Sequence, residues 1–162
     1  DLPASFAGLG EAYAAIMAAE AARALRVEAA SPPGLLSPDL AALLEEGRAV
    51  PAEREHAARL RFAEARALAA DVLSGVDALL TPAVVGEAPR GLESTGDPVF
   101  NKTWTALHLP CATLPTGRGA GGMPVGIQLV GAWGRDALLL DVAAEAEARL
   151  LPGDQSSRPS AI

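Results

Sequence analysis

The first part of the chain carries apolar residues at helical spacing. Recurrence at three and four residues predicts a helix that begins near Ser5, or in the Asp1-Leu2-Pro3 segment before it. Its apolar stripe consists of Phe6, Leu9, Tyr13, Ile16, Met17 and Ala24. We expect this helix to end before the Ser31-Pro32-Pro33-Gly34 breaker, because Pro and Gly interrupt helices.

Two further helices follow by the same criteria. Ser37-Pro38 has the form of an N-cap followed by proline at the first helical position, and Gly47 is a plausible C-terminal stop. A third helix should run from Pro51 to about Leu73, with charged residues outside. Its expected inner face consists of Leu60, Ala63, Ala67 and Ala70.

The second half of the chain changes to short apolar runs separated by Pro and Gly. Residues 77–80, 111–114 and 125–130 have strand length, and the last of them alternates with a period of two. Residues 84–96 lack any period and are expected to form a loop. A short helix should begin at Asp97-Pro98 and end before Pro110, because the residue before a proline disfavours the helical region.

The chain ends with a hairpin, a helix and a polar segment. Residues 115–124 contain four glycines, so the strands on either side should pair antiparallel. Trp133 lies at the following corner, where we expect it to anchor the packing. A last helix should run from Arg135 or Asp136 to Leu150, followed by a flexible tail at residues 152–162.

This order predicts an α/β fold in which helices pack on a small mixed sheet. Residues 1–76 are expected to be mainly helical, and residues 77–151 to follow the order strand, loop, helix, hairpin, helix. Together they would form one portion of a larger domain. Three strands make a narrow sheet with apolar edges. We therefore expect the isolated chain to be covered by helices, to form a homo-oligomer, or to be poorly soluble.

Composition narrows the function classes. Half of the 162 residues are hydrophobic but only 4% are aromatic, so Ala and Leu dominate the packing. The net charge is −7 and no basic run offers a phosphate-binding surface, which argues against direct nucleic-acid binding. Cys111 is the single cysteine and no apolar run approaches a membrane span. We therefore expect a cytoplasmic protein without a membrane partner.

Four sequence pieces, in order, resemble the C-terminal part of the amidase signature family. They are Asp-Ala-Leu-Leu-Thr-Pro at 77–82, the Gly-Asp-Pro segment with its Trp-Thr helix at 96–105, Leu-Pro-Cys-Ala-Thr-Leu-Pro at 109–115, and Pro-Val-Gly-Ile-Gln-Leu-Val-Gly at 124–131. The resemblance implies a serine hydrolase that cleaves carboxylic amides with a Ser-Ser-Lys triad upstream of this region. The chain, which begins with Asp rather than Met, would be the last third of such a protein and inert alone.

The resemblance also places residues near the substrate. Asp97, Trp104 and Thr105 would contact a small-molecule amide, although Asp97 can instead cap the helix and Trp104 can be core. Where the family commonly has glycine, this chain has His108, which either tolerates an ordinary backbone or modifies a nearby pocket.

Residues for catalysis are missing from the sequence. Lys102 is the only lysine and has no Gly-Ser-Ser partner nearby, and the only Ser-Ser pair, Ser156-Ser157, lies in the tail. A lysine base and its serine nucleophile need a shared, desolvated site, so neither is expected to be catalytic. His108 and Cys111 do not make a metal site by themselves, and nothing points to a cofactor.

Two alternatives remain open at this point. The chain can be a non-catalytic binding or assembly module that keeps the amidase architecture. It can also be a fragment of the amidase subunit of a tRNA-dependent amidotransferase, which we rank below a small-molecule amidase. In the leading interpretation, its main partner is the N-terminal portion of the same domain.

Overall fold

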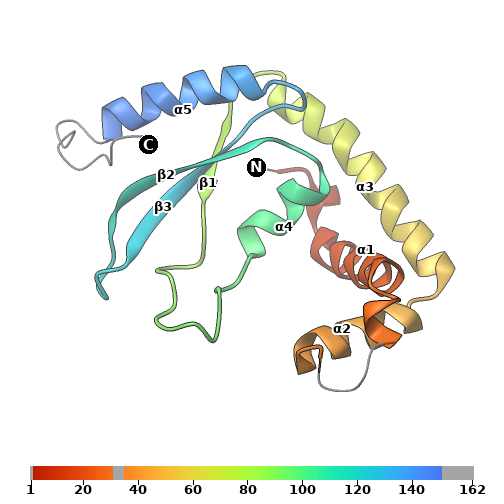
Figure 1. Cartoon of the computed structure of the whole chain (residues 1–162). Helices are drawn as coiled ribbons and strands as arrows, with labels where there is room; N and C mark the ends of the chain where they lie inside the picture. The colour runs from red at the N-terminus through yellow and green to blue at the C-terminus, as the bar shows by residue number, and fades with distance from the viewer. Residues whose placement is uncertain (1, 31–34, 151–162) are drawn as a thin grey trace. The chain divides into compact units, whose positions relative to one another are not determined.

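The computed structural model describes residues 2–30 and 35–150 (Figure 1). By its internal contacts the chain divides into two compact units, Asp1–Ala69 and Ala70–Ile162. The predicted breaker at 31–34 and tail at 152–162, with its Ser156-Ser157 pair, lie outside the described residues. Within the described residues, no helix has the length and apolar character needed to cross a membrane. The elements in order are η1 (Ala4–Phe6), α1 (Leu9–Ala24), η2 (Glu28–Ala30), α2 (Pro38–Ala49), α3 (Ala52–Leu73), β1 (Leu79–Pro82), α4 (Val99–Ala106), β2 (Cys111–Arg118), β3 (Pro124–Val130) and α5 (Asp136–Leu150).

In the first unit, α1 buries alanines instead of the large residues of the predicted stripe. Leu9 is buried as expected, but Met17 is 38% exposed. The remaining buried positions are Ala12, Ala15, Ala18, Ala19 and Ala22. Phe6, Tyr13 and Ile16 are half-buried and Ala24 is exposed, so the predicted stripe is correct only in part. The physical reason is the neighbour: α1 packs against α2, and small side chains permit a close approach of two helices.

The start of α2 is as predicted, and its end is not. The Ser37 hydroxyl accepts a hydrogen bond from the Leu40 N–H at 3.3 Å, and Pro38 opens the helix. Gly47, expected to stop the helix, is instead buried inside it, since α2 continues to Ala49. Its role is to approach α1 closely.

The bounds of α3 match the prediction closely, whereas its inner face does not. Leu60, expected inside, is 52% exposed. The buried positions are Ala58, Phe62, Ala65, Ala69 and Leu73. Alanine occurs at helical spacing on both faces of α3, so the alanine pattern does not distinguish them. The buried aromatic ring of Phe62 does.

The second unit contains a three-stranded sheet in the order β1-β3-β2. The α/β class is confirmed, but strand direction needs a correction: in the described residues both pairings are antiparallel, so the sheet is not mixed. The reason is the central place of β3. It forms the predicted hairpin with β2 and pairs antiparallel with β1 on its other edge. The strands β1 and β2 run in the same direction without pairing with each other.

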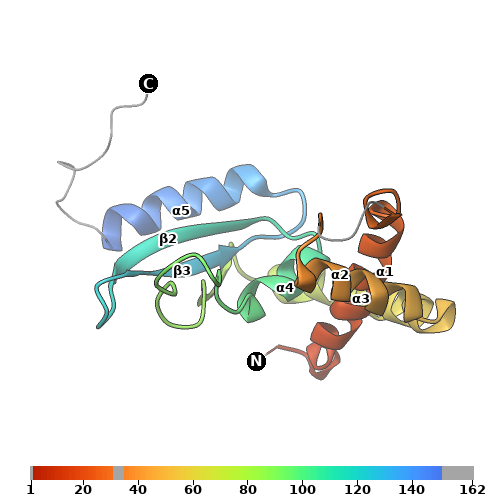
Figure 2. The same cartoon turned by 60° about the horizontal axis from the view of Figure 1, so that its bottom comes forward.

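Helix α5 covers one face of this sheet, and α4 lies on the other face (Figure 2). Leu114 and Leu129 point toward α5 and meet Leu139 and Ala143 in a small core. Alternate residues of β3 point to the opposite face. Gln128 is one of these, and it is buried.

Candidate functional site

Helix α4 is fastened to the sheet by polar side chains. Gln128 is 2% exposed, and its Nε2 donates to the Thr81 hydroxyl at 3.3 Å and to the Phe100 carbonyl at 3.2 Å. Asn101 donates from Nδ2 to the Ala83 carbonyl at 3.1 Å. These bonds join β1, β3 and the first turn of α4. The segment that carries the predicted site residues is therefore held against one face of the sheet.

Asp97 precedes α4 and contacts the start of its own helix. Its Oδ1 accepts a hydrogen bond from the Val99 N–H at 3.0 Å and lies 4.0 Å from the Lys102 Nζ. The side chain is still 62% exposed. The N-cap of α4 is Pro98, which has no side-chain cap, so Asp97 bonds to the first residue of the helix from one position before the cap. Contact between Asp97 and a substrate stays a prediction.

Trp104 and Thr105 lie at the other end of α4. Trp104 is 6% exposed, as the core alternative requires, whereas Thr105 is exposed. A helix rises about 1.5 Å per residue, so Val99, at the end of α4 next to Asp97, and Thr105 are separated by roughly 9 Å along the axis. The structure does not bring the three predicted residues into one cluster. A substrate that touched both ends would have to extend along the helix.

His108 ends α4 in a left-handed conformation, with φ of 59°. The His108 N–H donates to the Thr105 carbonyl at 3.0 Å, and the Leu109 N–H donates to the Trp104 carbonyl at 3.1 Å. This is the Schellman arrangement, in which glycine usually occupies the left-handed position. The expectation that His108 has an ordinary backbone is therefore wrong. Its side chain also lines a hollow.

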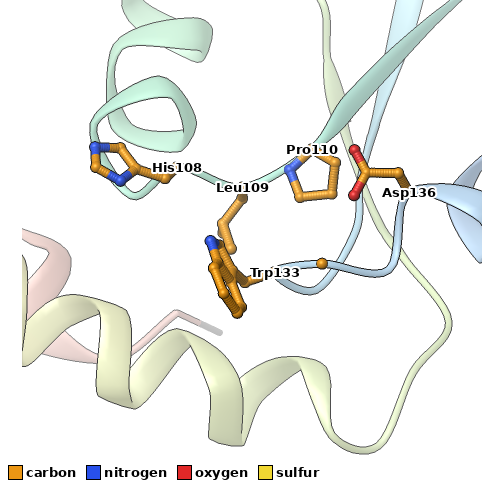
Figure 3. A pocket seen from close by; sticks show the side chains of 6 residues that line it. His108, Leu109, Pro110, Trp133 and Asp136 are labelled. Carbon is orange, nitrogen blue, oxygen red and sulfur yellow. The ribbon is translucent and has the colours of Figure 1, made fainter.

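That hollow has a volume of about 380 Å³ and is formed by two corners of the chain (Figure 3). Trp133, expected from the sequence to anchor the packing, is instead 76% exposed, and Gly134 next to it has a φ of 71°. The Asp136 carboxylate lies at the edge of the hollow, at the start of α5. The six lining residues are His108, Leu109, Pro110, Trp133, Gly134 and Asp136.

Cys111 does not have the features of a nucleophile. The residue is exposed, yet packing around its sulfur raises the pKa of the thiol. A raised pKa disfavours the reactive thiolate. Within residues 2–30 and 35–150 no three candidate ligands group together around a metal position.

Comparison with known proteins identifies the relatives of the chain. No protein-family model matches it. It is 51% identical over 51 residues to 6-aminohexanoate-cyclic-dimer hydrolase from Paenarthrobacter ureafaciens, covering 32% of this chain and 10% of that protein. It is 38% identical over 79 residues to a mitochondrial glutamyl-tRNA(Gln) amidotransferase subunit from Ornithorhynchus anatinus, covering 43% of this chain and 15% of that protein.

Solved structures extend the similarity to nearly the whole chain. A crystal structure of an amidase superposes with a TM-score of 0.79 at 30% identity, covering 92% of this chain and 37% of the amidase. The chain's relatives and structural neighbours are amidase signature enzymes. A crystal structure of a bacterial aryl acylamidase of the amidase signature family superposes with a TM-score of 0.62 at 22% identity. The superposition covers 98% of this chain and 38% of the acylamidase, and at this identity it shows the fold alone. The chain thus spans well under half the length of the amidase signature enzymes it matches.

Sequence reasoning misses the role of Gln128 in this amidase-like unit, because periodicity presents it only as one of the residues alternating along a strand. A glutamine between Ile127 and Leu129 in an apolar run is the available signal, because a buried amide requires hydrogen-bond partners. The partners themselves, Thr81 and the Phe100 carbonyl, lie 47 and 28 residues away in sequence. No local pattern reveals such distant contacts.

Proposed function

We propose that this chain is part of an amidase-family hydrolase that cleaves carboxylic amides. The observation that carries the proposal is the 30% identity and TM-score of 0.79 with an amidase over 92% of the chain. In this proposal the chain supplies scaffold and part of the substrate pocket. The Ser-Ser-Lys triad belongs to a segment outside these 162 residues.

The chemistry of amide cleavage supports placing the scaffold in this chain and the catalytic triad in another segment. Amide cleavage needs an activated nucleophile and donors preorganised for the oxyanion. A lysine base must be neutral, which requires a desolvated setting. Lys102 is instead 38% exposed and faces the Asp97 carboxylate. The nucleophile and base of the proposed reaction therefore come from elsewhere.

The contribution of this chain is the α4 region. Asp97 is exposed at one end of α4 and offers a carboxylate to a polar substrate group. Thr105 is exposed at the other end, and Trp104 between them gives the helix a buried anchor. Gln128 holds the helix against the sheet.

A serine-directed probe tests the proposal. The purified 162-residue chain should neither hydrolyse p-nitroacetanilide nor react with a fluorophosphonate. A longer protein from the same reading frame, with a Gly/Ser-rich segment upstream, should do both. Labelling of any serine in the 162-residue chain would overturn the division. If the longer reading frame encodes no Gly/Ser-rich segment and no upstream lysine, the chain is better explained as a non-catalytic binding or assembly module.

A second candidate is the amidase subunit of a tRNA-dependent amidotransferase. The 38% identity to the mitochondrial amidotransferase protein favours it. The net charge of −7 is compatible with it, because a companion protein can provide the RNA contacts. Genes for companion subunits next to this one would support the second candidate. Hydrolysis of p-nitroacetanilide by the longer protein without a companion would support the first.

A further inference from the structure

The loop at residues 83–97 is attached to the turn of the β2–β3 hairpin, and the carboxylate of Glu87 makes two of the hydrogen bonds. The Gly121 N–H donates to Glu87 Oε1 at 2.7 Å, and the Met123 N–H donates to Glu87 Oε2 at 2.9 Å. Both carboxylate oxygens therefore bind backbone of the same turn. Hydrogen bonds to a charged acceptor are about twice as strong as neutral ones.

A second side chain of the loop binds the same turn. The Arg90 guanidinium donates to the Gly121 carbonyl. Glu87 thus binds the N–H of Gly121, and Arg90 binds its C=O. Together they define the path of the loop across the hairpin.

The glycines of the turn are explained by Glu87. Gly119 and Gly121 do not have a positive φ, whereas Gly117 and Gly122 do, so backbone conformation does not require glycine at 119 or 121. A β-carbon on Gly119 would lie 2.1 Å from Glu87 Oε1, and one on Gly121 would lie 2.9 Å from Oε2. Glycine at these two positions leaves room for the carboxylate.

The ends of the loop are fixed independently. Ala83 at its start donates its N–H to the Gly126 carbonyl at 3.3 Å and accepts from Asn101 at 3.1 Å. Asp97 at its end bonds to the first turn of α4. Between these ends, Glu87 provides two of the bonds that join the middle of the loop to the sheet.

We propose that Glu87 is a positioning residue, which holds residues 83–97 on the hairpin turn and thereby shapes the approach to Asp97 and α4. The consequence for substrate rests on the proposed amidase function. The attachment itself does not. The two parts are tested separately.

Limited trypsin digestion of the 162-residue chain tests the attachment, because Arg90 is a cleavage site within the loop. Glu87→Gln keeps the side-chain size but replaces one acceptor oxygen by a donor amide facing an N–H. Loss of charged hydrogen bonds should raise the rate of cleavage after Arg90 about tenfold, since proteolysis follows the population of the open form. Glu93→Gln is the matched control, because Glu93 lies in the same loop and has no partner among the described residues.

A second variant guards against an effect of Glu87→Gln on folding. Gly119→Ala places a methyl group where the carboxylate lies and should also accelerate cleavage after Arg90. Circular dichroism should show the wild-type helix content in all three variants. Equal cleavage rates for Glu87→Gln, Glu93→Gln and wild type would overturn the attachment.

The longer protein tests the consequence for substrate. Glu87→Gln should raise KM for p-nitroacetanilide severalfold and leave kcat within twofold, and Glu93→Gln should change neither. Faster proteolysis with an unchanged KM would overturn the positioning role. A longer protein that hydrolyses no amide would count against the proposed function, while the trypsin comparison would still decide the attachment.

Discussion

Gly47 on α2 lies directly against the backbone of Ala18 on α1. A β-carbon at Gly47 would be 1.9 Å from the Ala18 carbonyl oxygen and 2.9 Å from the Ala22 β-carbon. Backbone atoms of a helix do not move aside as the end of a flexible side chain does. The first unit therefore depends on glycine at this helix crossing.

Gly47→Ala should destabilise the first unit in spite of alanine's higher helix propensity. Overpacking of a close contact costs roughly 1–3 kcal/mol, and this clash is with backbone, so we expect at least about 2 kcal/mol from urea denaturation. Gly10→Ala is the control. It lies in α1 with nothing within 4 Å of its added β-carbon and should be neutral or stabilising by up to about 1 kcal/mol. Equal stability of the two variants would contradict the close crossing.

Some helix bounds follow from local chemistry, but the buried faces do not. Ser37-Pro38 predicts the start of α2 because capping is decided by neighbouring atoms. The inner faces of α1 and α3 depend on which partner lies beside them, and alanine at every turn leaves several faces equivalent. The wrong prediction for Gly47 has a similar cause. Glycine is favoured both where a helix ends and where two helices cross closely, so a glycine near the end of a helix does not distinguish the two.

The candidate site is predictable to the same extent. The sequence places Asp97 at the start of a helix and Trp104 within it, and the structure agrees. The left-handed backbone of His108 and the exposure of Trp133 both depend on how the chain leaves an element. Gln128 and Glu87 act through partners more than 25 residues away, which periodicity does not report.

His108→Gly should leave the second unit more stable than His108→Ala does. A left-handed conformation costs a residue with a β-carbon about 1–2 kcal/mol, and glycine is free of that penalty. His108→Ala separates the backbone effect from loss of the imidazole, because alanine retains the β-carbon. We expect the glycine variant to exceed the alanine variant by about 1 kcal/mol in urea denaturation. Equal stabilities would show that the backbone at residue 108 is not strained.

Gln128→Leu should loosen α4 from the sheet. Leucine fills similar space but leaves the Phe100 carbonyl and the Thr81 hydroxyl without the amide donor. Loss of a part-buried hydrogen bond costs about 1 kcal/mol. Hydrogen exchange of the α4 amides should accelerate in this variant. Thr116→Val serves as the control, because it removes an exposed hydrogen bond to Val125 and should leave α4 exchange unchanged.

The acid dependence of stability should be dominated in the first unit by Glu55. Its carboxylate accepts two hydrogen bonds from Arg23, each 2.7 Å long, and two more from Arg59. These bonds, those from Arg23 first and those from Arg59 next, lower the pKa of Glu55 to about 2. The glutamate pKa in an unfolded chain is about 4.3. Because the folded pKa is the lower one, the contribution of Glu55 is complete above about pH 4.3 and is lost as the pH falls toward 2.

Urea midpoints between about pH 7 and pH 2.5 measure this contribution. Wild type should lose stability below about pH 4, where protonation of Glu55 opposes its bonds to two guanidinium groups. Glu55→Gln should be less stable at neutral pH and flatter over the acidic range. Glu45→Gln removes a glutamate that pairs with Arg48 on α2 but has a side chain 73% exposed, against 15% for Glu55. Exposed pairs contribute little, so Glu45→Gln should keep the wild-type acid profile. A Glu55→Gln variant with the same profile would assign the acid sensitivity to other carboxylates.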